Sequence, residues 1–196
     1  MSGSFVYGLC VAVLLFAGVH GAAAAEFKGG ALAPPRPAPD FTLKGAGGEA
    51  FRLRDQRGKV VALSFGYTFC PDVCPTTLAE LVQVREALGT AKDGFRLVFV
   101  TVDPERDTPQ RLREWAAAFS GGFTALTGPP DDLAKLRKVY GVVAEKRIVK
   151  GTSAAYLVDH SAFVYVIDRE GQLRLMFPFG TRIDDMTHDI RLLMRR

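Results

Sequence analysis

The sequence predicts an α/β fold in which a central mixed sheet is flanked by helices and preceded by an N-terminal β-hairpin. Three apolar runs, at 60–65, 95–102 and 163–167, have the length and composition of buried strands. Segments with helical spacing separate them, and strand–helix–strand units favour parallel pairing with right-handed crossovers. Cys70 and Cys74 directly follow the first run. A dithiol loop at this place in such a sheet is a thioredoxin-like arrangement.

Local patterns predict each element in turn. Residues 41–43 and 51–53 alternate apolar and polar residues around a glycine-rich turn, which is typical of a β-hairpin. Residues 60–65 are apolar on both faces, as expected for a central strand covered by helices. Pro75 and Gly89 bracket apolar residues at helical spacing and predict a helix between them. The other expected elements are a helix over 109–120, a helix over 131–140, a hairpin within 142–156, a strand over 173–177 that pairs antiparallel with 163–167, and a helix over 183–193.

Two segments precede the predicted domain, which spans residues 40–196. Residues 1–25 contain no Asp, Glu, Lys or Arg, are almost continuously apolar over 5–18, and end in small residues. This composition predicts either a cleaved signal peptide or a retained N-terminal membrane anchor. Both place the rest of the chain outside the cytoplasm, in the periplasm or on the outer face of the inner membrane. Residues 26–39 are rich in Pro, Gly and Ala and predict an extended tether.

Composition narrows the classes of function. The 196 residues are 48% hydrophobic and 23% charged, which suits one domain with an ordinary core. The formal charge of +4 is not gathered into a Lys/Arg cluster, so nucleic-acid binding is not expected. Two cysteines in an exported domain are also typical of a structural disulfide. A bridge across three residues closes a very short loop, however, and short loops stabilise least in the chain-entropy model.

The dithiol loop carries the chemistry that we expect. Cys70 and Cys74 lie at or near a helix N-terminus, whose partial positive charge lowers a cysteine pKa and favours the thiolate. Three residues separate the sulfurs, where a redox Cys-x-x-Cys motif has two. Both sulfurs could converge on one metal ion or oxidise to a disulfide. Two soft sulfurs favour Cu(I), although zinc and iron–sulfur centres also use thiolates.

A histidine is the candidate third ligand. His160 lies just before the strand at 163–167, and Asp159 could orient its ring or a neighbouring loop. Periodicity alone does not decide whether this histidine reaches the dithiol loop. His188 lies on the last predicted helix, and we expect a structural role for it.

Three separated motifs resemble those of the SCO/SenC family. They are residues 64–75 (SFGYTFCPDVCP), 102–108 (VDPERDT) and 156–161 (YLVDHS), and the resemblance extends from about residue 39 to 179 in the same order. It implies a thioredoxin-like fold tethered to a membrane. It also implies a copper chaperone that helps to assemble the binuclear copper A centre of cytochrome c oxidase.

The resemblance further implies a site and partners. Cys70 and Cys74 match the family's two thiolate ligands, His160 matches its imidazole ligand, and Asp103 matches an acidic residue near the site that is not a ligand. One copper per chain, as Cu(I) or Cu(II), is the implied cargo. The implied partners are the copper-bearing subunit of cytochrome c oxidase, a copper donor and a thiol reductant.

Other functions use the same residues. A metallochaperone needs no bond-breaking catalysis, so the chain is expected to act as a carrier more than as an enzyme. The alternative is an exported thiol–disulfide oxidoreductase or thiol peroxidase, in which one cysteine of the Cys70/Cys74 pair attacks and the other resolves. A Cys₂His zinc site with an open position also fits the ligand set, but no general base accompanies it. A chain that carries copper and also reduces its acceptor's thiols would combine both activities.

Overall fold

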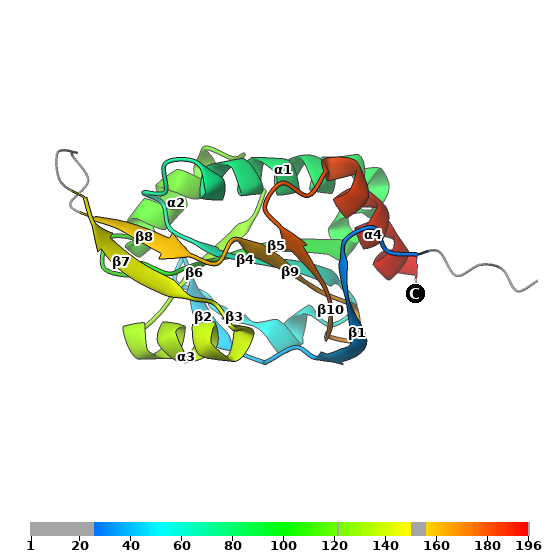
Figure 1. The fold of residues 1–196 in the computed structure, drawn as a ribbon, viewed down its shortest axis with the longest axis horizontal. Helices are drawn as coiled ribbons and strands as arrows, with labels where there is room; N and C mark the ends of the chain where they lie inside the picture. Colours follow the sequence, from blue (N-terminus) through cyan, green and yellow to red (C-terminus); the bar gives the residue numbers. More distant parts are fainter. Residues whose placement is uncertain (1–25, 121, 150–155, 196) are drawn as a thin grey trace, which may run out of the picture.

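The computed structural model describes residues 26–120, 122–149 and 156–195, which form an eight-stranded mixed sheet, a separate two-stranded sheet and flanking helices (Figure 1). The strand order of the large sheet is β1-β10-β9-β4-β5-β6-β2-β3, and β7 pairs with β8. The strands are β1 (Gly30–Pro37), β2 (Thr42–Gly45), β3 (Ala50–Arg52), β4 (Val60–Gly66), β5 (Phe95–Thr101), β6 (Thr124–Thr127), β7 (Ala144–Ile148), β8 (Tyr156–His160), β9 (Phe163–Ile167) and β10 (Gln172–Pro178). The helices are α1 (Val73–Ala87), α2 (Pro109–Ala117), α3 (Pro130–Tyr140) and α4 (Ile183–Arg195), with 3₁₀ turns η1 (Leu53–Gln56) and η2 (Gly89–Gly94).

Strand β4 is the centre of the sheet, as its apolar sequence predicts. All seven of its residues are buried. It pairs in parallel with β5, with Ser64 opposite Phe99, and antiparallel with β9, with Ser64 opposite Val164. Because β9 runs antiparallel to β4, the residues just before β9 lie beside those just after β4. The sheet direction therefore brings the segment before Phe163 to the cysteine loop.

Helices cover both faces of the sheet and bury two apolar clusters. Helices α1, α2 and α4 lie on one face and α3 on the other (Figure 1). Even-numbered residues of β4, such as Ala62, belong to the cluster beneath α1, α2 and α4. Odd-numbered residues, such as Leu63, belong to the cluster beneath α3. This split follows from the two-residue period of a strand. The predicted fold class, a mixed sheet flanked by helices with an N-terminal hairpin, is confirmed.

The helix ends follow ordinary capping chemistry. At α2, the Thr108 side chain accepts a hydrogen bond from the Arg111 backbone N–H, and proline occupies the first helical position. Helix α3 ends at Gly141, whose φ of 71° suits glycine. Helix α1 begins at Val73, two residues before the proline that the sequence analysis placed at its start. Cys74 consequently lies inside the first turn.

Two parts of the sheet differ from the expectation. Residues 30–37, expected to be part of a tether, form edge strand β1, which pairs with β10. The backbone N–H groups of Lys28 and Gly29 also donate hydrogen bonds to the buried Asp189 on α4. Strand β6 was not predicted, because its four residues TALT lack the long apolar run of a buried strand. A hairpin, β7–β8, is present, but its second strand covers Tyr156–His160 and so lies beyond the expected range of 142–156.

The predicted signal or anchor, residues 1–25, lies outside the described residues. Among the helices that are described, none combines the length and the apolar character that a membrane crossing requires. Strand β8 and the beginning of α1 lie at one end of the molecule, and β1 and α4 lie at the other (Figure 1).

Candidate metal centre

The two cysteines lie on the loop between β4 and α1. The Cys74 backbone N–H, in the first turn of α1, donates a hydrogen bond to Cys70 Sγ at 3.4 Å. A sulfur thus accepts from one of the N–H groups that a helix N-terminus leaves without an intrahelical partner. Cys70 is half-buried, Cys74 is 4% exposed, and both are free thiols.

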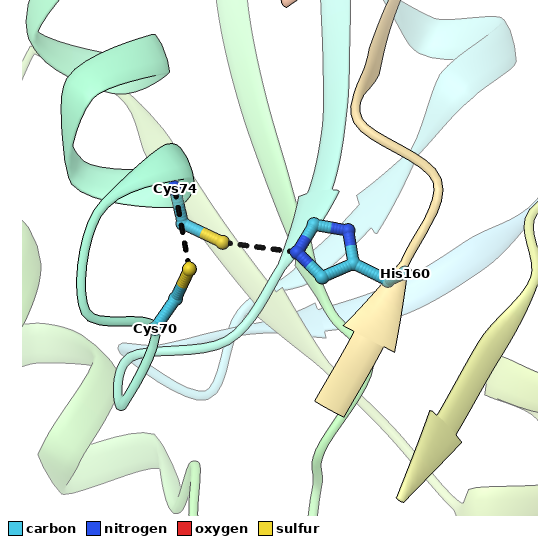
Figure 2. Close-up of side chains that lie close together, drawn as sticks. All are labelled: Cys70, Cys74 and His160. Atoms are coloured by element: carbon cyan, nitrogen blue, oxygen red, sulfur yellow. Dashed lines mark hydrogen bonds between the residues drawn. The ribbon is translucent and has the colours of Figure 1, made fainter. Parts of the chain in front are cut away.

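His160 ends β8 and points at these sulfurs (Figure 2). Its Nε2 lies 3.2 Å from Cys74 Sγ. The imidazole ring also packs edge-on against Tyr67, with ring centroids 5.9 Å apart. His160 therefore reaches the dithiol loop, which periodicity alone did not decide.

The second ring nitrogen fixes the tautomer of His160. Nδ1 lies 3.0 Å from the Ser161 carbonyl oxygen, which can only accept, so Nδ1 carries the proton and Nε2 presents its lone pair to the sulfurs. The idea that Asp159 orients the ring is wrong, because this carboxylate instead accepts two hydrogen bonds from Arg147 across the β7–β8 hairpin. Neighbours in a strand point to opposite faces, and Asp159 therefore points away from His160.

The two sulfurs have opposite electrostatic environments. The hydrogen bond from the Cys74 side chain lowers the pKa of Cys70 to about 4, with further help from His160 and the Asp72 and Cys74 backbone, against the effect of burial. The same bond, together with burial, raises the pKa of Cys74 above its ordinary value. At neutral pH the pair therefore holds one thiolate, on Cys70, and one thiol, on Cys74.

The three donor atoms are placed to share one ion. Cys70 Sγ, Cys74 Sγ and a ring nitrogen of His160 lie within 4.8 Å of one another, and no other group of three such residues was found in the described part of the chain. A three-coordinate ion with typical thiolate and imidazole bonds would hold these atoms about 4 Å apart. Side-chain adjustments of less than about 1 Å would then close the site.

The site opens to solvent on one side. A cavity of about 270 Å³ adjoins it, and its lining includes Tyr67, Cys70, Arg147 and His160. Cys74 does not line this cavity. Cys70 and His160 can therefore be reached from outside, whereas Cys74 lies further inside the protein.

Residues behind the loop fix its course. Asp107 is fully buried and accepts hydrogen bonds from the Thr68 backbone N–H, the Thr68 hydroxyl and the Thr101 hydroxyl. Its burial raises the pKa of the carboxyl group. The sequence analysis missed this supporting role, although Asp107 is part of the motif at 102–108.

The remaining candidates lie outside the ligand cluster. Asp103 is buried and binds Arg106 and Tyr156, in agreement with its expected place near the site and not in it. His188 lies 2.9 Å from the Asp189 carboxylate on α4. It shares no donor cluster with the cysteines.

Gly66 leaves the space that Cys74 occupies. A Cβ atom at this position would lie 2.7 Å from Cys74 Sγ and 2.8 Å from Phe99 Cε2. These distances are shorter than ordinary van der Waals contacts. The lack of a side chain at Gly66, the last residue of β4, therefore makes room for the Cys74 sulfur.

Known proteins resemble this chain in sequence. The family model described as SCO1/SenC matches residues 31–195. An SCO2-like protein of Rickettsia conorii is 32% identical over 152 residues, which cover 78% of this chain and 74% of that protein. Across four Rickettsia relatives, the matched part makes up 64% to 74% of the relative's length.

Solved structures are similar as well. The copper-bound structure of ScoI from Bradyrhizobium japonicum has a TM-score of 0.73 and 34% identity, covering 80% of this chain and 99% of that one. The apo solution structure of Sco1 from Thermus thermophilus has a TM-score of 0.73 and 38% identity, covering 87% of this chain and 97% of that one.

Proposed function

Because this chain belongs to the SCO1/SenC family, we propose that it is a metallochaperone that binds one copper ion through Cys70, Cys74 and His160. The observation that carries the proposal is the convergence of two sulfurs and one imidazole nitrogen within 4.8 Å at the mouth of a cavity. Two thiolates select a soft ion such as Cu(I), and the imidazole also suits Cu(II). The copper-bound structure of a similar protein supports this choice of metal.

The asymmetry of the ligands suggests how the ion is taken up and released. Cys70 and His160 line the cavity, so an incoming ligand can exchange with them first, while the inner sulfur of Cys74 holds the ion. Stepwise exchange then passes the ion on, with each incoming thiolate replacing one of the three ligands, and no carbon–sulfur or peptide bond is broken. We propose that the acceptor is the copper A centre of cytochrome c oxidase, because the resemblance to the SCO/SenC family implies this acceptor.

Oxidation of the two cysteines would prevent copper binding. If the Cys70 thiolate and the Cys74 thiol lose two electrons and one proton to an external disulfide, which is reduced to a thiol and a thiolate, the bond that forms between them removes both sulfur ligands. A thiol reductant must then restore the pair in an oxidising compartment. We place the protein there, outside the cytoplasm, because residues 1–25 have the composition of an export signal or membrane anchor.

Metal binding by the full-length, reduced protein under anaerobic conditions tests the proposal. We expect about one copper per chain and, after mild oxidation of the ion, a sulfur-to-Cu(II) charge-transfer band. His160→Ala should abolish or shift that band, whereas His188→Ala, the matched control on α4, should leave it unchanged. Retention of zinc in preference to copper would contradict the choice of metal.

Delivery needs a separate measurement. Copper-loaded protein mixed with the metal-free copper-bearing subunit of cytochrome c oxidase should lose its charge-transfer band as the acceptor gains its own. Copper that stays on the chaperone after the acceptor thiols are reduced would contradict delivery.

One observation favours a second candidate, the thiol–disulfide oxidoreductase. Cys70 is accessible and its pKa is lowered to about 4, as in an attacking thiolate. The same His160→Ala variant separates the two functions, because it removes a metal ligand and leaves both thiols. If His160→Ala loses copper binding but keeps disulfide exchange, then the same two cysteines serve both activities.

A further inference from the structure

The Arg106 side chain lies between the cysteine loop and the hairpin that carries His160. Its guanidinium carbon is 3.6 Å from the ring centroid of Tyr156, on β8. It also lies 4.8 Å from the ring centroid of Phe69 and 5.6 Å from that of Tyr67, both on the cysteine loop. A planar guanidinium stacks well on aromatic faces, so one side chain contacts both halves of the candidate site.

Hydrogen bonds close a three-residue cluster around this arginine. Arg106 Nε donates to Asp103 Oδ2 at 2.6 Å, and Nη1 donates to the Tyr156 backbone carbonyl at 2.9 Å. The Tyr156 hydroxyl donates to the other Asp103 oxygen at 2.8 Å. The Asp103 side chain is fully buried and that of Arg106 is 18% exposed, so solvent screens these contacts little.

Beyond the buried side chain of Val158, which packs into the core, the described residues give the hairpin few other strong attachments. Strands β7 and β8 form their own sheet and add no strand to the large one. The ion pair between Lys146 and Glu105 also links the hairpin to the loop after β5, but both of its side chains are well exposed. Exposed pairs of this kind contribute little to stability.

Tyr156 and His160 lie on the same face of β8. The side-chain period of a strand is two, so residues 156, 158 and 160 point the same way, and Val158 between them is buried. An anchor at Tyr156 therefore fixes the face of β8 that presents the imidazole. Without the anchor, the two cysteines stay on the β4–α1 loop, and only the imidazole loses its position.

We propose that Asp103, Arg106 and Tyr156 form a latch that holds β8 against the cysteine loop and thereby adds His160 to the two sulfurs. The proposal rests on the proposed copper function. The latch discriminates between oxidation states, because two thiolates satisfy Cu(I), whereas Cu(II) gains more from the imidazole. Arg106 and Tyr156 are thus positioning residues for Cu(II).

Three variants of the full-length protein test the latch. Arg106→Gln removes the charge and the stacking, Arg106→Lys restores the charge alone, and Tyr156→Phe removes the hydroxyl bond to Asp103 but keeps the aromatic ring. Glu105→Gln is the matched control, since it alters the exposed link between the same loop and the same hairpin. Affinities for Cu(II) and for Cu(I) are measured separately, by competition with chelators selective for each ion.

We expect Arg106→Gln to weaken Cu(II) binding about 10- to 100-fold, as changes next to metal-bound histidines do. Cu(I) affinity should change less than about threefold, because both thiolates remain. Arg106→Lys and Tyr156→Phe should fall between this variant and the parent, and Glu105→Gln should match the parent. Equal losses for both ions, or no loss for either, would overturn the latch.

A second readout uses the metal-free protein. The edge contact between His160 and Tyr67 should give a nuclear Overhauser effect in the parent and in Glu105→Gln. Its loss in Arg106→Gln, with the amide spectrum of the large sheet unchanged, supports the latch, and its retention in Arg106→Gln overturns it. If the parent binds no copper, the proposed function fails, and this measurement still decides whether the latch positions His160.

Discussion

Replacing Gly66 with alanine should disrupt the candidate site from behind. The added Cβ would lie 2.7 Å from Cys74 Sγ and 2.8 Å from Phe99 Cε2, whereas ordinary contacts begin near 3.4 Å. The Cys74 sulfur would therefore have to move by roughly 0.7 Å and the Phe99 ring carbon by roughly 0.6 Å. Neither moves freely, because Phe99 is fully buried and Cys74 is held in the first turn of α1.

Overpacking of this size in a core costs about 1–3 kcal/mol. Urea unfolding of Gly66→Ala should show that loss of unfolding free energy, and the charge-transfer band of bound copper should weaken or shift as the Cys74 sulfur is displaced. The same substitution in a Cys74→Ala background should cost less, because one of the two clashing atoms is gone. A double-mutant cycle measures the difference, which we expect to be on the order of 1 kcal/mol. Gly66→Ala with parental stability and an unchanged band would refute this reasoning.

Three further predictions concern the thiols and the N-terminal edge. Iodoacetamide should alkylate Cys70 faster than Cys74, at a rate that is nearly constant from about pH 5 to 8 because the pKa of Cys70 is lowered to about 4; a rate that rises tenfold per pH unit would contradict this. Copper affinity should rise about tenfold per pH unit near neutrality, because Cys70 is already a thiolate and loading must remove the proton held by the raised pKa of Cys74; a pH-independent affinity in competition titrations would count against it. Asp189→Asn should lower the unfolding free energy by about 1–3 kcal/mol and speed amide exchange at Lys28 and Gly29, whose N–H groups the carboxylate accepts; unchanged exchange would show that the carboxylate does not hold this edge.

The central strand and the dithiol loop could be predicted because their signals are local. Residues 60–65 are apolar throughout, and Cys70 and Cys74 follow directly, so one short stretch of sequence contains the strand, the turn and the start of α1. The helix caps were equally local. The family resemblance then named His160 as the third ligand.

The proximity of His160 to the two cysteines could not be derived from periodicity. It depends on the direction of β9, which lies antiparallel to β4, and strand direction is a property of the whole sheet. Strand β1 was missed for a related reason: its proline-rich sequence is typical of a tether, yet the open edge of β10 accepts it. The latch joins residues about 50 positions apart, and a linear pattern does not show the stacking of Arg106 on Tyr156.

The proposed function requires that the two sulfurs hold the copper ion. The most direct measurement is the copper content and affinity of the full-length, reduced protein with Cys70→Ser and Cys74→Ser together, compared with the parent under anaerobic conditions. We predict about one copper per parent chain and loss of tight binding in the double variant, because hydroxyl oxygens do not replace thiolates for Cu(I). A double variant that binds one copper with unchanged affinity would contradict the site and the function built on it.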